Sequence, residues 1–144
     1  MKNSYLLITA LLVILCFSDF YSQDIGILYT KNEADIKYGS VLESVELTKS
    51  QMESLLRKTS DCMMFRIVKG ELIILGDNRN LLTSSGSFVK ESDVYYMFSK
   101  SKVIELMKMG GERSLFVEQR ETRLTVTCGK VTLEEAIFCP PFCE

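Results

Sequence analysis

Cysteine is the residue type in this sequence best suited to chemistry, and five cysteines are present. Cys139 and Cys143 are separated by Pro-Pro-Phe at the end of the given sequence. This C-x-x-x-C spacing would suit a thiol redox pair, a Cu(I) clamp or a disulfide. Histidine is absent from the sequence, which excludes Ser-His-Asp and Cys-His catalysis and zinc bound by histidine. The tail therefore offers sulfur chemistry or a structural staple.

The N-terminus has the composition of a secretory signal peptide. Lys2 supplies a positive charge, residues 5–17 form an apolar run, and a polar stretch follows. The run is shorter than the roughly 20 residues that a membrane-spanning helix needs. We predict a signal peptide over 1–23 and an exported chain over 24–144, periplasmic or secreted. The alternatives are an uncleaved membrane anchor and a lipid attached to Cys16 after cleavage.

Four cysteines follow the predicted signal peptide. An even count in an exported chain favours disulfides, and four cysteines allow three pairings. Either Cys139 and Cys143 bond each other, or each of them reaches back to Cys62 or Cys128. The candidates for disulfide bonding are therefore Cys62, Cys128, Cys139 and Cys143.

Two short motifs resemble the catalytic boxes of known enzyme families. The Gly-Asp-Asn-Arg run at 76–79 resembles the GDNR box of type I signal peptidases. Ser99-x-x-Lys102 resembles the S-x-x-K box of penicillin-recognising enzymes. The partner boxes of the first family do not precede residue 76, and the K-T-G box of the second is missing. We interpret 76–79 as a turn and Ser99 as a helix cap.

Hydrophobic periodicity predicts the elements that position the cysteines. Thr48 and Gln51 form a capping-box signature, and the apolar stripe after it predicts a helix over 49–58. A second helix is predicted over 99–109, where Gly110-Gly111 ends the stripe. Extended segments are predicted over 62–68, 71–75, 81–83, 88–89, 94–98, 114–119, 122–128 and 131–138. For the last of them the alternative is a short helix over 133–138, because Thr132 and Glu135 also match a capping box.

This order of elements predicts one α+β domain over 24–144. We expect an antiparallel sheet or meander of about five to six strands with two helices packed on one face. The segment before the first helix is expected to be extended, and the tail carries the cysteine pair. The run Glu-Gln-Arg-Glu-Thr-Arg at 118–123 is expected at an exposed hairpin tip, as a solvated turn or as a contact surface.

The net charge and the residue types of the chain narrow the class of function further. A formal net charge of -2 offers no basic footprint for nucleic acid. No membrane span is expected after signal removal, and no catalytic, cofactor-binding or metal-binding constellation is evident. We expect a non-catalytic binding or structural module, stabilised by disulfides, whose partner is an unknown protein or a small ligand. The alternative is a thiol-redox or Cu(I)-handling protein that uses Cys139 and Cys143.

Overall fold

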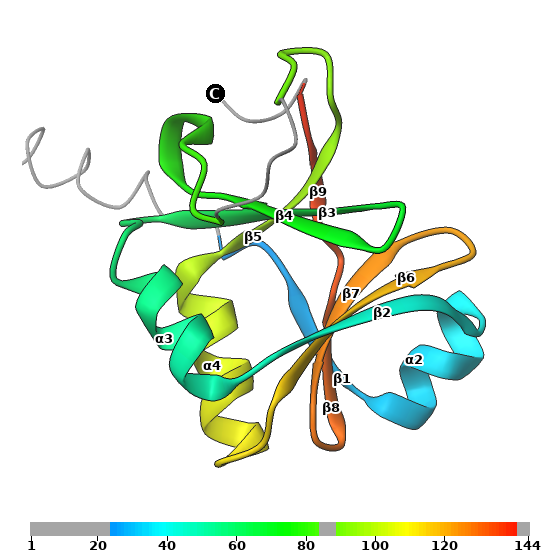
Figure 1. The fold of residues 1–144 in the computed structure, drawn as a ribbon. Coiled ribbons are helices and arrows are strands. Elements are labelled where there is room, and N and C mark those ends of the chain that lie inside the picture. Colours follow the sequence, from blue (N-terminus) through cyan, green and yellow to red (C-terminus); the bar gives the residue numbers. More distant parts are fainter. Residues whose placement is uncertain (1–23, 84–88, 141–144) are drawn as a thin grey trace, which may run out of the picture.

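A computed structural model describes residues 24–83 and 89–140 of the chain (Figure 1). Helices and antiparallel strands both contribute, so the predicted α+β class is confirmed. The elements are β1 Ile27–Thr30, α2 Lys31–Tyr38, β2 Val41–Leu47, α3 Lys49–Leu56, β3 Cys62–Val68, β4 Glu71–Leu75, the 3-10 turn η1 Asp77–Arg79, β5 Tyr95–Ser99, α4 Lys100–Gly110, β6 Leu115–Arg120, β7 Leu124–Cys128, β8 Val131–Glu134 and β9 Ile137–Cys139.

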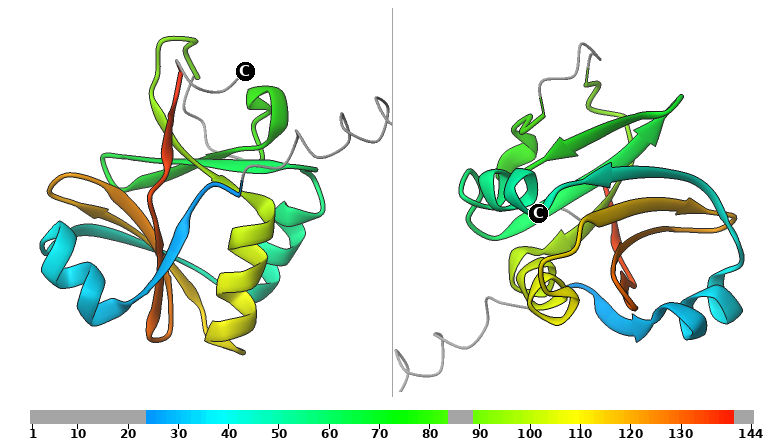
Figure 2. Two further views of the ribbon diagram at one scale, coloured as in Figure 1. Left: turned by 180° about the vertical axis from the view of Figure 1, so that it is seen from behind. Right: turned by 60° about the horizontal axis from the view of Figure 1, so that its bottom comes forward.

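The strands form two sheets, whereas the sequence predicted one. One sheet has five strands in the order β1-β8-β7-β6-β2, and the other has four in the order β4-β3-β5-β9. Every pair of neighbouring strands is antiparallel. The two sheets cross one above the other, as both views of Figure 2 show.

The main hydrophobic core lies between the two sheets and helices α3 and α4. Both helices contribute their predicted apolar stripes, such as Met52 on α3 and Leu106 on α4, both with no exposed surface. From the five-stranded sheet, alternate residues such as Val117, Val126 and Leu133 point into the same core. The opposite face of that sheet is covered by α2, so α2 lies across the sheet from α3 and α4 (Figures 1 and 2).

The strand predicted over 131–138 is wrong as a single element. Glu135 has a positive φ of 60°, a conformation that breaks a strand and is rare for a residue with a side chain. The chain therefore leaves β8 in one sheet and enters β9 in the other. This break also excludes the alternative helix over 133–138.

The N-terminal third differs most from the sequence prediction. Residues before the first predicted helix were expected to be extended, but they form β1, α2 and β2. Thr30 caps α2 with a complete capping box, in which its hydroxyl accepts from the Glu33 N–H and Glu33 accepts from the Thr30 N–H. The same signature at Thr48 and Gln51 begins α3 as predicted.

Smaller differences concern the segment after β4. The strand predicted over 81–83 is a single bridge between Leu81 and Leu75. The extended segment predicted at 88–89 is not a strand at Val89, and Phe88 lies outside the described residues. Over 24–83 and 89–140, no helix is long and apolar enough to cross a membrane.

Candidate functional site

The structure separates the cysteines that the sequence grouped as disulfide candidates. Cys62 and Cys128 are free thiols, whereas Cys139 is disulfide-bonded and Cys143 lies outside the described residues. Cys62 pairs with Ser99 at one end of β5, and Cys139 pairs with Tyr95 at its other end. Four residues of strand span about 13 Å, beyond the reach of a disulfide. The pairings that reach back to Cys62 or Cys128 are therefore not made in this structure.

Neither free thiol is placed for reactivity. Burial, together with the neighbouring Asp77 carboxylate, raises the pKa of the Cys62 thiol to about 12. Burial also raises the pKa of the Cys128 thiol. Because the thiolate is the nucleophile and the metal ligand, both side chains are inert near neutral pH. In the part of the chain that the structure describes, no cluster of three His, Cys, Asp or Glu residues could hold a metal ion.

The two motifs that resemble catalytic boxes of enzymes make hydrogen bonds that stabilise the fold. The Asp77 carboxylate accepts hydrogen bonds from the backbone N–H groups of residues 60–62. The Arg79 guanidinium donates to the carbonyls of Lys90 and Asp93, which fastens the loop before β5. The Ser99 hydroxyl exchanges hydrogen bonds with the Ile25 backbone. These contacts agree with the interpretation of 76–79 as a turn.

Ser99 occupies the N-cap position of α4, but its side chain makes no capping hydrogen bond there. Lys102 pairs with Glu105 at 2.8 Å instead of with Ser99. The S-x-x-K spacing therefore does not produce a serine–lysine pair.

The most unusual chemistry lies where α2 covers the five-stranded sheet. Alternation places Val117, Val126 and Leu133 in the core, so the residues beside them point to the α2 side. Six side chains on that side are polar or charged and yet nearly inaccessible to solvent. We call this set the polar face: Glu118, Arg120, Thr125, Thr127, Thr132 and Glu134, none of them more than 4% exposed.

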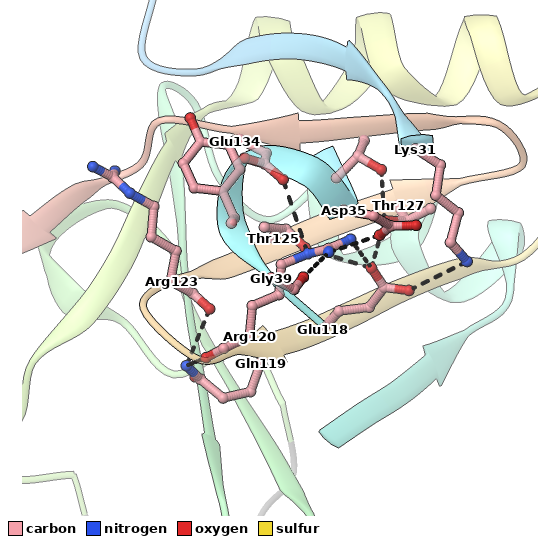
Figure 3. Close-up of polar contacts among 12 residues, drawn as sticks. Lys31, Asp35, Gly39, Glu118, Gln119, Arg120, Arg123, Thr125, Thr127 and Glu134 are labelled. Carbon is pink, nitrogen blue, oxygen red and sulfur yellow. Dashed lines mark hydrogen bonds and ion pairs between the residues drawn. The ribbon is translucent and has the colours of Figure 1, made fainter. Parts of the chain in front are cut away.

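Arg120 is the centre of the polar face, and its side chain has no exposed surface (Figure 3). Its Nη1 atom donates to Asp35 Oδ1 of α2 at 2.8 Å and to the Gly39 carbonyl at 2.6 Å. On the sheet, Nη2 donates to Glu118 Oε2 at 3.3 Å and Nε to Thr125 Oγ1 at 3.3 Å. The planar guanidinium thus connects the helix to two strands, which a lysine could not do with one ammonium group.

Glu118 is held by a ladder of hydroxyl groups. Thr127 donates to Glu118 Oε2 at 2.8 Å, and Thr127 in turn shares a 3.0 Å hydrogen bond with Thr132 on β8. At its other oxygen, Oε1, Glu118 lies 3.9 Å from Lys31 Nζ at the start of α2. The cluster therefore extends from buried strands to the exposed beginning of the helix, as Figure 3 shows.

Glu134 is the exception in this cluster. It has no exposed surface, and among the described residues neither of its carboxyl oxygens has a hydrogen-bond partner. Its nearest charge is Arg120, whose Nε lies 3.9 Å from Glu134 Oε1. Burial raises the pKa of Glu134 to about 7, against the opposing effect of Arg120. An uncharged carboxyl group is less costly in such surroundings than a carboxylate.

A second, more exposed cluster fixes the end of α2. Glu135 accepts a hydrogen bond from Lys37 Nζ at 2.8 Å and another from the Tyr38 hydroxyl. Arg123 Nη1 lies 3.5 Å from the other Glu135 oxygen. The hydrogen bond from Lys37, then that from Tyr38, lowers the pKa of Glu135. Glu134 and Glu135 are therefore adjacent carboxyl groups with opposite pKa shifts.

A surface depression of about 400 Å³ adjoins the polar face. Asp35 and Lys31 line it and also contact Arg120 and Glu118, so the depression and the buried cluster share two residues. A second depression of about 580 Å³ surrounds the beginning of α3 and is polar. The first is lined by Thr30, Lys31, Asn32, Asp35 and Lys130.

The expectation of an exposed run at 118–123 is wrong for its two key residues. Glu118 is 4% exposed and Arg120 has no exposed surface, because β6 continues through residue 120 and α2 covers it. Asp35 and Glu134 were not predicted from the sequence. A signal was present in the alternation of polar residues along β6, β7 and β8, but such alternation normally marks a solvent-facing side.

Comparison of the chain with protein-family models, with curated proteins and with solved structures finds no match.

Proposed function

We propose that this chain is a small exported binding module, stabilised by a disulfide, that carries out no catalytic chemistry of its own. The observation that carries the proposal is the way α2 is attached to the five-stranded sheet. Charged residues of the sheet hold the helix, while Ile36 points away from the sheet with 79% of its surface exposed. A helix held on the sheet by polar contacts can present an apolar side chain to a partner.

Two more exposed apolar residues support this reading. Ile27 on β1 is 51% exposed and Leu42 on β2 is 66% exposed. These strands directly precede and follow α2 in the chain. Because β1 and β2 are the two outer strands of the five-stranded sheet, Ile27 and Leu42 lie at its opposite edges. We refer to Ile36 on α2, together with these two edge residues, as the α2 surface. Exposed apolar side chains mark a protein contact site where they form a contiguous patch with a polar surround.

A protein partner fits the α2 surface better than a small ligand. Small-ligand sites bury most of the ligand's surface in a concave pocket. The depression beside α2 is open, and its lining includes Lys31 and Lys130. These two lysines would complement acidic groups around an apolar contact.

Crosslinking from the surface of the folded protein tests this function. A photoreactive benzoylphenylalanine is placed at Ile36 and, as a matched control, at Met109, which is 59% exposed on α4. In the cell that naturally makes the protein, irradiation is expected to give a discrete adduct from position 36 and none from position 109. Equal adducts from both positions, or none from position 36, would contradict the proposal.

Thiol counting by intact mass tests export and the disulfide. The exported chain is expected to begin near Asp24 and to resist alkylation while folded. Denaturation without reductant should expose the two free thiols, Cys62 and Cys128, and reduction should expose the pair predicted for Cys139 and Cys143. Thiols at 139 and 143 that react in the folded, exported protein would favour the redox or Cu(I) alternative instead.

A further inference from the structure

Polar contacts rather than apolar packing hold α2 on the sheet. Of its eight residues, Ala34 and Tyr38 are buried, whereas α3 and α4 each bury three aliphatic or methionine side chains. Asp35 and the Gly39 carbonyl contact Arg120, Tyr38 and Lys37 contact Glu135, and Lys31 contacts Glu118. Lys37 and Tyr38 also contact Tyr29 of β1. The attachment of α2 therefore depends on the charge states beneath it.

Glu134 is the group beneath α2 whose charge state is least fixed by its neighbours. Its carboxyl oxygens accept no hydrogen bond within the described residues. The guanidinium of Arg120 is committed to other partners: Nη1 to the helix, Nη2 to Glu118 and Nε to Thr125. A protonated Glu134 leaves this arrangement undisturbed. An ionised Glu134 needs a charged donor, and the guanidinium 3.9 Å away is the nearest cation.

We propose that α2 is a proton-controlled cover over the polar face: it is held down while Glu134 carries a proton, and it is loosened when Glu134 ionises and draws Arg120 away from the helix. A charge-assisted hydrogen bond has a length of about 2.7–2.9 Å. Closing the 3.9 Å gap therefore requires the guanidinium to move by about 1 Å. That movement lengthens the contacts from Nη1 to Asp35 and to the Gly39 carbonyl, which hold the second half of α2.

The charges around Glu134 set the direction of the switch. From β6, Arg120 favours its ionised form, and the Glu118 carboxylate on the same strand competes for that guanidinium. From α2, Lys37 favours ionisation, Lys31 is engaged with Glu118, and Asp35 is engaged with Arg120. From the turns beyond β6 and β8, Arg123 favours ionisation and Glu135 opposes it. Burial outweighs all of them, so the closed form retains the proton of Glu134 to a higher pH than an open form would.

Hydrogen exchange of the α2 amides tests the proposal on the full exported chain, and it does not require a partner. After correction for the intrinsic exchange rate, protection of α2 relative to α4 is expected to fall by up to about tenfold per pH unit between the ordinary carboxyl pKa and about 7. Above that pH the ratio should level off. Glu134→Gln cannot ionise, and its α2 protection should stay at the low-pH value throughout. The control Glu46→Gln, at an exposed glutamate of β2, should behave like the unmodified chain.

Two results would overturn the proposal. One is a pH profile of α2 protection that is the same in Glu134→Gln and in the unmodified chain. The other, which needs no variant to fold, is a carbon-13 titration of the Glu134 carboxyl group that gives an ordinary glutamate pKa. A raised pKa together with selective loss of α2 protection supports the switch.

Discussion

Replacement of Arg120 by methionine tests the whole polar face, because one side chain there connects α2 to two strands. Methionine fills most of the volume of the arginine stem, so the main loss is electrostatic. The guanidinium contacts Asp35, the Gly39 carbonyl and Glu118, and the last of these has a side chain only 5% exposed. Removal of one partner from a buried ion pair costs about 3–5 kcal/mol. That is a large fraction of the roughly 5–15 kcal/mol that stabilises a typical domain.

The loss should depend on pH in a defined direction. Without Arg120, the buried carboxyl group of Glu134 loses the cation that favours its ionised form, so its pKa rises further. Groups with raised pKa values stabilise the folded state when protonated and lose that contribution as the pH rises. The variant should therefore lose the full amount at about pH 8 and less at about pH 5.

Urea unfolding measures this loss by far-ultraviolet circular dichroism, since the chain has no tryptophan. Arg57→Met serves as the control, because Arg57 is exposed at the end of α3 and should change stability by no more than about 0.5 kcal/mol. The double variant Arg120→Met with Glu118→Gln should recover part of the loss, since no buried carboxylate is then left at position 118. A loss below about 1 kcal/mol, or the same loss at both pH values, would refute the assignment of Arg120 as the charge that holds this face.

Two further predictions concern other regions of the fold. Asp77→Ala should cost about 1.5–3 kcal/mol at neutral pH, because its carboxylate accepts from the backbone N–H groups of residues 60–62. Burial opposes ionisation of Asp77, but these hydrogen bonds prevail and lower its pKa from 3.8 to about 2. The stabilisation by the carboxylate is therefore present above pH 3.8 and is lost as the pH falls through 2. In an acid titration, the stabilities of the variant and of the unmodified chain should converge near pH 2. Gly110→Ala should cost about 1–3 kcal/mol in urea unfolding, since an added Cβ would lie 2.0 Å from Cys128 Sγ; an unchanged midpoint would show that α4 can shift away from β7 without cost.

Local chemistry made several elements predictable. The capping box at Thr48 and Gln51 and the apolar stripe after it define α3, and Lys69-Gly70 forms the turn between β3 and β4, with φ of 51° and 82°. These features depend on residues close in sequence. Helix α2 carries the same capping box at Thr30 and Glu33 but buries little apolar surface. Periodicity therefore gave no signal there, because charges on a distant strand hold this helix.

The amino-acid sequence by itself determined the α+β class, the helices that carry an apolar stripe, and the exclusion of histidine chemistry. It also determined which residues share a face, because strand side chains alternate. Only the tertiary structure decided what covers each face. By alternation alone, Glu118 and Arg120 belong to a polar side that would normally meet solvent. Arg120 pairs with Asp35 on α2 and with Glu118 on β6. Because this contact joins segments far apart in the chain, residues whose alternation is typical of a solvent-facing side form a buried charge cluster instead.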